Sequence, residues 1–383
     1  MKEKALEYHK NGKLSISSRV NLENAQDLAL AYTPGVAEPC LEIAKNTEDA
    51  YKYTSKGHMV AIVTDGSAVL GLGDIGAAAS IPVMEGKALL LKKFADVDAF
   101  PICIDSKDTN KIIDTVKLIS PVFGGIILED ISAPRCVTIE RELKKALDIP
   151  VFHDDQHGTA IVVGAGLINA SRLIKKPLSE MRIVVLGTGA SGSAVMRIIK
   201  GLGVKAINAV NILGAVTTDN YYKYDFVVRE LIDEKIITPV ARDLKVEDLL
   251  VGADAFIGLS GPNLVSEAMI KSMNSNAIVF SLANPTPEIM PDLAKSAGAR
   301  VVATGRSDFP NQVNNVLAFP GIFKGVLQVR AKQITEEMKL TAAKAIASLI
   351  KDDELSDEYI IPSAFDNRVV DTVSNAIIEV AKK

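Results

Sequence analysis

The chain has 383 residues, and its 48% hydrophobic and 23% charged residues are typical of a soluble globular protein of about two domains. A formal net charge of −4 without a Lys/Arg-rich tract argues against nucleic acid as a partner. No stretch reaches the roughly 18 apolar residues of a membrane span, and the charged N-terminus has no secretory signal, so we expect a cytoplasmic protein that makes no membrane contact. Its three cysteines show no CxxC spacing, which argues against disulfides and structural zinc.

Four apolar segments in the first half of the chain are typical of buried strands that end in acids: residues 59–66, 98–105, 121–130 and 149–155. Helical patterns such as residues 85–97 lie between them, and this alternation predicts a parallel sheet with helices on its faces. Ligands of such sheets bind at the carboxyl ends of the strands. The acids expected at this edge are Asp65, Asp105, Glu129, Asp130, Asp154 and Asp155.

The second half begins with a charge-free helical pattern at residues 158–171, followed by a strand, a glycine-rich turn and a helix at residues 181–203. Strands and helices then continue to the C-terminus. The further predicted elements are strands at 253–260, 276–288 and 299–305, a helix at 237–250 and a helical tail from about residue 331.

These patterns predict an α/β protein with two domains and a boundary near residue 155. Residues 1–155 would form an α/β domain that binds the substrate and a metal. Residues 156–383 would form a Rossmann-type, doubly wound dinucleotide-binding domain that ends in the helical tail.

The strongest local signal is the sequence "GTGASG", because it stands between a buried strand and an amphipathic helix. Its glycines permit a tight turn and a close approach to a pyrophosphate at the helix N-terminus. The alternative is a helix that merely starts with a tight turn. The predicted cofactor-binding residues of this turn are Gly187, Thr188, Gly189, Ala190, Ser191 and Gly192.

Two other features bear on the ligands of these domains. The second strand of the Rossmann unit ends at Asn211, where NAD-binding domains usually carry an acid for the ribose diol, so the choice between NAD and NADP stays open. A second glycine motif, "GLGDIG" at residues 71–76, has an Asp at its centre. We expect this motif to shape a substrate pocket rather than to bind a dinucleotide.

The acids of "LEDI" and "HDDQHG" are candidate metal ligands. Glu129, Asp130 and Asp155, with Asp154 beside them, would suit a hard ion such as Mg²⁺ or Mn²⁺, which prefers oxygen ligands. Solvated strand ends, or Asp155 as a helix cap, are the alternative reading of the same residues. The histidines that flank these aspartates are expected to pack and hydrogen-bond rather than to bind the ion.

Five polar residues elsewhere are candidates for catalysis or substrate binding. Lys87 stands at the start of an apolar helix, where partial burial would lower its pKa toward that of a useful base, although a surface lysine fits the pattern too. Tyr32 on a stiff turn is either a packed aromatic or a phenolic acid. The amides of Asn284, Asn314 and Asn315 could bind substrate carboxylates or cap turns.

Taken in order, these stretches resemble the malic enzyme family in its short prokaryotic form, from about residue 13 to the C-terminus. The order and number of the motifs make the resemblance far more specific than any single motif. The stretches are "AYTPGVAEPC", "TDGSAVLGLGDIGAAASIPVMEGK", "ILEDI", "VFHDDQHGTAIV", "VVLGTGASG", "LANPTPE", "NNVLAFPG" and "YIIPSAFDNRV".

The resemblance implies oxidative decarboxylation of L-malate to pyruvate and CO₂, with NAD or NADP as hydride acceptor and Mg²⁺ or Mn²⁺ as Lewis acid. It assigns the metal to Glu129, Asp130 and Asp155. It makes Lys87 the general base and Tyr32 the general acid.

The resemblance also gives the remaining candidates a place. Asp154 would orient the base, and the asparagines Asn284 and Asn314 would bind the substrate, with Asn284 next to the cofactor as well. The long eukaryotic forms carry a malate-binding arginine where this chain has Ala68, so another group must hold that carboxylate.

Three questions remain open at the level of sequence. Family members tend to form dimers, so we expect a homodimer, in which Tyr32 would serve its own site or that of the partner. The same acids would also fit a malate dehydrogenase, an oxaloacetate decarboxylase or a malolactic enzyme. A regulatory protein that binds the cofactor without turnover is the alternative outside enzymes, and the intact Tyr32, Lys87 and acids argue against it.

Overall fold

The computed structural model describes residues 2–69, 71–242 and 244–382. Within these residues the strands form a four-stranded sheet, ordered β2-β1-β3-β4, and a six-stranded sheet, ordered β10-β9-β8-β5-β6-β7. The strands of the first sheet are β1 Met59–Thr64, β2 Asp98–Cys103, β3 Gly125–Leu128 and β4 Val151–His153. Those of the second are β5 Arg182–Leu186, β6 Ala206–Asn211, β7 Gly214–Ala215, β8 Ala255–Gly258, β9 Ile278–Ser281 and β10 Val301–Thr304.

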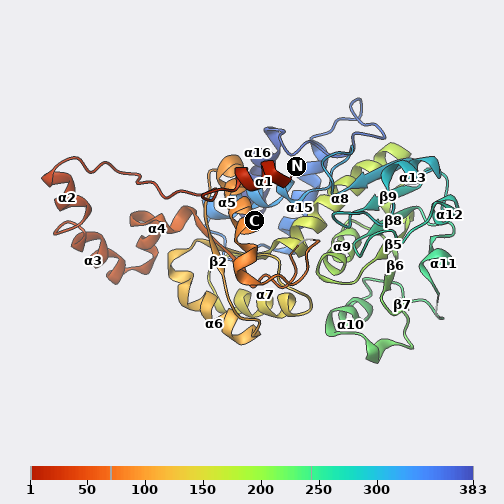
Figure 1. Ribbon diagram of the computed structural model, residues 1–383, viewed down its shortest axis with the longest axis horizontal. Helices are drawn as coiled ribbons and strands as arrows, with labels where there is room; N and C mark the ends of the chain where they lie inside the picture. Colours follow the sequence, from red (N-terminus) through yellow and green to blue (C-terminus); the bar gives the residue numbers. More distant parts are fainter. Residues whose placement is uncertain (1, 70, 243, 383) are drawn as a thin grey trace.

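Helices cover both sheets (Figure 1). The helices up to the first sheet's last strand are α1 Lys2–Tyr8, α2 Ala25–Ala31, α3 Ala37–Lys45, α4 Ala50–Tyr53, α5 Gly76–Ala95, α6 Thr109–Ile119 and α7 Arg135–Ala146. Those that follow are α8 Asp154–Ile174, α9 Ala190–Gly201, α10 Phe226–Asp233, α11 Val246–Leu250, α12 Glu267–Lys271, α13 Pro291–Ser296, α14 Phe319–Gln328, α15 Glu336–Ser348 and α16 Arg368–Ala381.

All neighbouring strands pair in parallel except β6 and β7. The central strands β1, β3 and β5 are buried on both faces, which is why they are continuous runs of Val, Ile and Leu rather than alternating sequences. Parallel pairing brings the carboxyl ends of the strands to one edge, as the acids at those ends require. The predicted α/β architecture with a Rossmann-type second sheet is confirmed.

Helix α8 connects the two sheets and is buried along most of its length. The sequence explains this position, because the helix carries almost no charge and has glycines where other elements come close. A Cβ on Gly164 would lie 2.9 Å from Ile198 of α9, and one on Gly166 would lie 3.2 Å from Phe280 of β9. Close packing of the helix against the second sheet therefore depends on these small residues.

The C-terminal helices pack against elements of both halves of the chain. Helix α14 lies against α5 and α16, and Phe323 of α14 meets Phe152 of β4 edge-to-face at 6.0 Å between ring centroids. Helix α15 packs on α8. The first sheet is therefore completed by residues far away in the sequence.

The predicted helix over residues 237–250 is wrong for most of the residues that the structure describes there, because among them only those of α11 are helical, and residue 243 lies outside the described residues. Residues 238–240 instead pair with neighbouring chain: the amide of Thr238 donates to Ile207, and that of Val240 donates to Val216. Pro239 has no amide to donate within a helix, and pairing beside β6 satisfies the neighbouring backbone groups instead.

The segment with α2 and α3 forms an arm that stands away from both sheets, at the left of Figure 1. Neither helix has a buried residue, although Leu28, Leu30 and Leu41 are apolar and at least half exposed. The described part of the chain contains no helix long and apolar enough to cross a membrane.

Candidate active site

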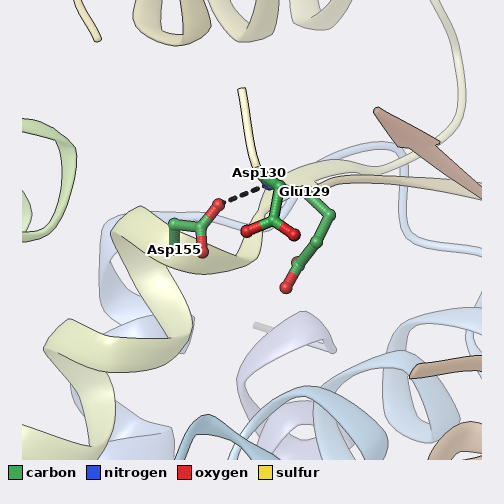
Figure 2. Close-up of side chains that lie close together, drawn as sticks. All are labelled: Glu129, Asp130 and Asp155. Atoms are coloured by element: carbon green, nitrogen blue, oxygen red, sulfur yellow. Dashed lines mark hydrogen bonds between the residues drawn. The ribbon is translucent and has the colours of Figure 1, made fainter. Parts of the chain in front are cut away.

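Three carboxylates meet at the carboxyl edge of the first sheet, as Figure 2 shows. Glu129, Asp130 and Asp155 each offer an oxygen, and these oxygens lie within 4.8 Å of one another. Glu129 and Asp130 directly follow β3, where consecutive side chains would normally point to opposite faces. Asp130 has a φ of 53°, and this left-handed conformation interrupts the alternation so that both side chains can face Asp155.

The first turn of α8 explains why two aspartates stand side by side in the sequence. Consecutive residues of a helix point about 100° apart, so Asp154 and Asp155 face different neighbours. Asp155 Oδ2 accepts a hydrogen bond of 2.8 Å from the amide of Asp130, whereas Asp154 Oδ2 accepts one from Lys87 Nζ. The alternative reading of Asp155 as a helix cap is wrong, because α8 already begins at Asp154 and its N-cap residue is His153.

Lys87 lies in the middle of α5, buried between two acids, and not at the start of a helix as the sequence suggested. Its Nζ donates to Asp154 and, at 2.5 Å, to Glu129 Oε1. Burial lowers the pKa of Lys87, but the charges of Asp154 and Glu129 outweigh it and raise the pKa above its ordinary value. The predicted lowering is therefore wrong, because the sequence did not reveal which acids would surround the amine.

The acid cluster fits a divalent metal ion. Burial raises the pKa of Glu129 well above its usual range, and Asp155, Asp154 and Asp130 add to this effect while Lys87 opposes it. Glu129 Oε2 is buried and makes no hydrogen bond among the described residues. A buried carboxylate oxygen without a partner, next to two further carboxylates, is the oxygen-rich setting that Mg²⁺ and Mn²⁺ prefer.

Two other acids expected at the strand ends do not join this cluster. Asp65 is buried, but its Oδ2 accepts a 2.7 Å hydrogen bond from Arg135. Asp105 is exposed after β2. The convergence is therefore limited to the acids that follow β3 and begin α8.

The glycine-rich turn has the shape that a pyrophosphate requires. Gly187 has a φ of 113°, and a Cβ on Gly192 would lie 2.0 Å from the carbonyl oxygen of Gly187, so both glycines permit the turn itself. A Cβ on Gly189 would meet nothing within 4 Å, and helix α9 begins at the next residue, Ala190. The space beside Gly189 and the helix N-terminus together form a candidate phosphate site.

Ser191 joins the turn to the acid cluster, because its Oγ donates a 2.9 Å hydrogen bond to the carbonyl of Asp155. Thr188 is partly exposed next to it. At the far end of β6, Asn211 Oδ1 accepts a 2.8 Å hydrogen bond from the amide of Leu213. Its side-chain amide is therefore left as a hydrogen-bond donor, which suits a ribose hydroxyl or a phosphate equally.

The three candidate asparagines lie at a short helix and on a loop, and Asn315 among them adjoins the acids. Asn315 packs next to Asp154, since a Cβ placed on Gly158 would meet Asp154 Oδ1 at 1.9 Å and Asn315 Cβ at 3.0 Å. Asn314 caps the short helix that follows it, with its Oδ1 accepting from Val316. Asn284 adjoins the glycine loop of the first domain, since a Cβ on Gly71 would lie 3.0 Å from its carbonyl oxygen.

Tyr32 is the candidate that the structure keeps apart within one chain. It is the C-cap residue of α2 on the projecting arm, and 67% of its surface is exposed. The acid cluster instead lies after β3 and at the start of α8, whereas α2 projects at the left of Figure 1.

Two residues near the cluster, Arg135 and Glu140, were not singled out from the sequence. The amide of Ala68 donates to the carbonyl of Asp130, and the Arg135 guanidinium lies behind this loop, where it binds Ser67 Oγ at 3.0 Å. Glu140 of α7 is buried, and its Oε1 lies 2.8 Å from Nε2 of His157, one of the two histidines that flank the aspartate pair. The only sequence signal for Glu140 is that an acid stands on the otherwise apolar face of a helix.

Comparison with known proteins shows the family of the chain. The family model of the malic enzyme N-terminal domain matches residues 10–144, and that of the malic enzyme NAD binding domain matches residues 156–383. The chain belongs to the malic enzyme family. The resemblance inferred from the motifs is thereby confirmed, as is the prediction of a domain for NAD or NADP.

Individual malic enzymes are similar over the whole chain. The bifunctional malic/malolactic enzyme of Bacillus subtilis is 52% identical over 100% of this chain and 93% of its own length, and the NAD-dependent malic enzyme of Geobacillus stearothermophilus is 52% identical over 97% and 77%. The crystal structure of the malic enzyme of Pyrococcus horikoshii has a TM-score of 0.94 at 49% identity, covering 100% of this chain and 90% of that one.

Proposed function

We propose that this malic enzyme family member oxidises and decarboxylates L-malate to pyruvate and CO₂ and transfers the hydride to NAD⁺ or NADP⁺. The observation that carries the proposal is the buried Lys87 between Asp154 and Glu129, next to two further metal-type carboxylates. The hydrogen bond from Ser191 to Asp155 supports it, because it joins the dinucleotide turn to these acids.

Glu129, Asp130 and Asp155 would hold Mg²⁺ or Mn²⁺, and the turn at Gly189 would hold the pyrophosphate of the dinucleotide. When bound, the ion supplies positive charge beside the substrate oxygens and Lys87, and the dinucleotide supplies the hydride acceptor. Asn284 and Asn314, with Asn315 beside Asp154, would bind the substrate carboxylates as neutral donors.

Lys87 would act as general base on the C2 hydroxyl of malate. In the structure its ammonium already donates to Asp154 and Glu129, and Asp154 would accept this proton so that the neutral amine could take the proton of the C2 hydroxyl. Asp154 also holds the amine in place through this hydrogen bond. After loss of CO₂ from C4, Tyr32 Oη would return a proton to C3, and the products would be pyruvate, CO₂ and the reduced dinucleotide.

The direct test follows absorbance at 340 nm with L-malate and Mn²⁺, with NAD⁺ or NADP⁺, and quantifies pyruvate. We expect one pyruvate per dinucleotide reduced, and loss of both signals with EDTA. Comparing the two dinucleotides decides the preference that Asn211 leaves open. Metal-independent turnover, or reduction without pyruvate, would contradict the proposal.

Malolactic activity is the second candidate, because the Bacillus subtilis relative is named a bifunctional malic/malolactic enzyme. The two reactions differ in their products, since a malolactic enzyme releases lactate without net reduction of the dinucleotide. Assaying lactate in the same mixtures distinguishes them. We also place the protein in the cytoplasm, with malate and neither nucleic acid nor membrane as its partner.

A second copy of the chain is the partner that we propose for the arm. Neither helix of the arm has a buried residue, so Leu28, Leu30 and Tyr32 are exposed. Exposed apolar side chains on a projecting segment are typical of an interface. In a two-fold dimer both arms would make the same contact. Tyr32 would then complete the site of the partner subunit.

A mixed dimer tests this arrangement. Tyr32→Phe and Lys87→Ala chains with different tags are co-expressed, and the heterodimer is isolated through both tags. If Tyr32 acts across the dimer, one of the two sites is intact, so we expect about half of the wild-type turnover. Background turnover by the heterodimer would show that Tyr32 serves its own chain, and a monomeric wild-type protein would contradict the dimer.

The turn glycines give a separate prediction for the dinucleotide. Gly189→Ala should fold normally, because the added Cβ meets nothing and the φ of −71° suits alanine, yet it should weaken dinucleotide binding by about tenfold by filling the phosphate site. Quenching or enhancement of reduced-dinucleotide fluorescence measures the affinity. Gly86→Ala, on helix α5 with room for a Cβ, is the matched control. Unchanged affinity in Gly189→Ala would argue against this phosphate site.

A further inference from the structure

We propose that Glu140 is a positioning residue that orients the candidate metal ligand Asp155 through Gln156 and His153. This inference rests on the proposed function, because it assumes that Asp155 binds a divalent ion. Glu140 belongs to α7. Within the part of the chain that the structure describes, no hydrogen bond or ion pair joins it directly to the three carboxylates of the cluster. Its effect must therefore pass through the residues between them.

Glu140 is 3% exposed and binds both residues that flank the aspartate pair on its side of α8. Its Oε2 accepts from Gln156 Nε2 at 3.3 Å, and its Oε1 accepts from His157 Nε2 at 2.8 Å. The backbone amide of His153 also points to Oε1, at 3.4 Å. One carboxylate therefore holds both the end of β4 and the first turn of α8, the turn that begins with Asp154 and Asp155.

The path from Glu140 to Asp155 has defined donors. Gln156 Nε2 lies 3.0 Å from His153 Nδ1, and since an amide NH₂ can only donate, Nδ1 is the acceptor and the proton of a neutral ring is on Nε2. Nε2 lies 3.3 Å from Asp155 Oδ2, a contact that is not a regular hydrogen bond. The proton-bearing edge of a fully buried imidazole therefore faces the carboxylate that also accepts from Asp130.

Two lysines keep Glu140 charged and fixed. Lys144 Nζ lies 2.6 Å from Glu140 Oε1, one helical turn away, and Lys339 of α15 donates at 3.0 Å to His157 Nδ1. Burial raises the pKa of Glu140, but His157, which donates a hydrogen bond to it, and the charge of Lys144 outweigh burial and hold the pKa well below its usual range. The anchor thus joins α7, α8 and α15, and its position does not depend on one contact.

Residues that hold a metal ligand through hydrogen bonds tune both its orientation and the affinity for the ion. The structure assigns this role to Glu140 for a second reason as well. A purely structural acid at this position would need only its ion pair with Lys144, whereas Glu140 places both oxygens toward the residues around Asp155. Loss of the Glu140 carboxylate should therefore weaken the binding of the metal ion more than the binding of the dinucleotide.

The test measures Mn²⁺ binding to the metal-free, full-length protein by calorimetry, without malate or dinucleotide. Glu140→Gln keeps the shape of the side chain and removes its charge, and Gln156→Met breaks only the path toward His153. We expect each variant to raise the Kd for Mn²⁺ by about tenfold, as is typical when a residue behind a metal ligand is changed. The double variant should bind Mn²⁺ about as weakly as the weaker-binding of the two single variants and no more weakly, since both substitutions act on one path.

Dinucleotide affinity and melting temperature show whether each variant remains folded. Glu142→Gln, an exposed acid on the same helix that binds Lys145 at 2.8 Å, is the matched control and should leave Mn²⁺ affinity unchanged. Wild-type affinity in both Glu140→Gln and Gln156→Met, or full additivity in the double variant, would overturn the positioning role. A wild-type protein that binds no Mn²⁺ would overturn the metal site as well, so the two failures are distinguishable.

Discussion

Replacing Lys87 by alanine is expected to lower kcat for malate-dependent dinucleotide reduction by about a thousandfold, within the range for loss of a general base. The amine is the basic group that lies against Asp154 and Glu129, and alanine removes the amine that would take the C2 hydroxyl proton. Dinucleotide binding should persist, because Lys87 lies on α5 and the glycine-rich turn lies in the second domain. Steady-state rates at 340 nm and reduced-dinucleotide fluorescence measure the two properties.

The same substitution leaves two buried carboxylates without their counter-charge, so some loss of stability is expected too. The melting temperature must therefore be recorded with the rate, at a temperature where the variant is folded. Lys92→Ala is the matched control, since Lys92 lies on the same helix, half exposed, and pairs with the surface acids Asp96 and Asp98. Turnover close to wild type in folded Lys87→Ala would remove Lys87 from the role of base.

Replacing Asp155 by alanine is expected to abolish Mn²⁺ binding and turnover together. Asp155 supplies one of the three clustered oxygens, and with it goes the carboxylate that accepts the amide of Asp130. Three protein oxygens are few for a hard ion, so the loss of one should raise the Kd by about a hundredfold or more. Calorimetry with Mn²⁺ and the rate at saturating malate test both effects in one preparation.

Asp148→Ala serves as control for this variant, because Asp148 is an exposed acid just before β4 that pairs only with Lys332 among its recorded ion pairs. Dinucleotide affinity again shows whether the second domain is intact. If Asp155→Ala retained metal-dependent turnover at the wild-type Mn²⁺ concentration, the assignment of the acid cluster as the metal site would be wrong.

Features that consecutive residues define could be predicted from the sequence, whereas features that depend on distant residues could not. The glycine-rich turn was predictable because strand, turn and helix are consecutive, and the turn, Gly187 to Gly192, needs no distant partner to be recognised. Strands such as Met59–Thr64 and Arg182–Leu186 were predictable for the same reason, since a run of buried β-branched residues bounded by turns carries its own signal.

The roles of single side chains were less predictable. The sign of the pKa shift of Lys87 was predicted wrongly, because burial is only one of its causes and the acids that reverse it are 42 and 67 residues away in the sequence. Residues 238–240 were predicted as helix because their pairing partners, at Ile207 and Val216, are equally invisible to a local pattern.

The α/β class, the dinucleotide turn and the acids at the strand ends could be predicted from the amino-acid order, since each depends on neighbouring residues and on the rule that parallel strands end at one edge. Which of those acids converge depends on the folding of the whole chain. It pairs Asp65 with Arg135, leaves Asp105 exposed and brings Glu129 and Asp130 to Asp155, because these choices depend on strand order and on the left-handed conformation of Asp130.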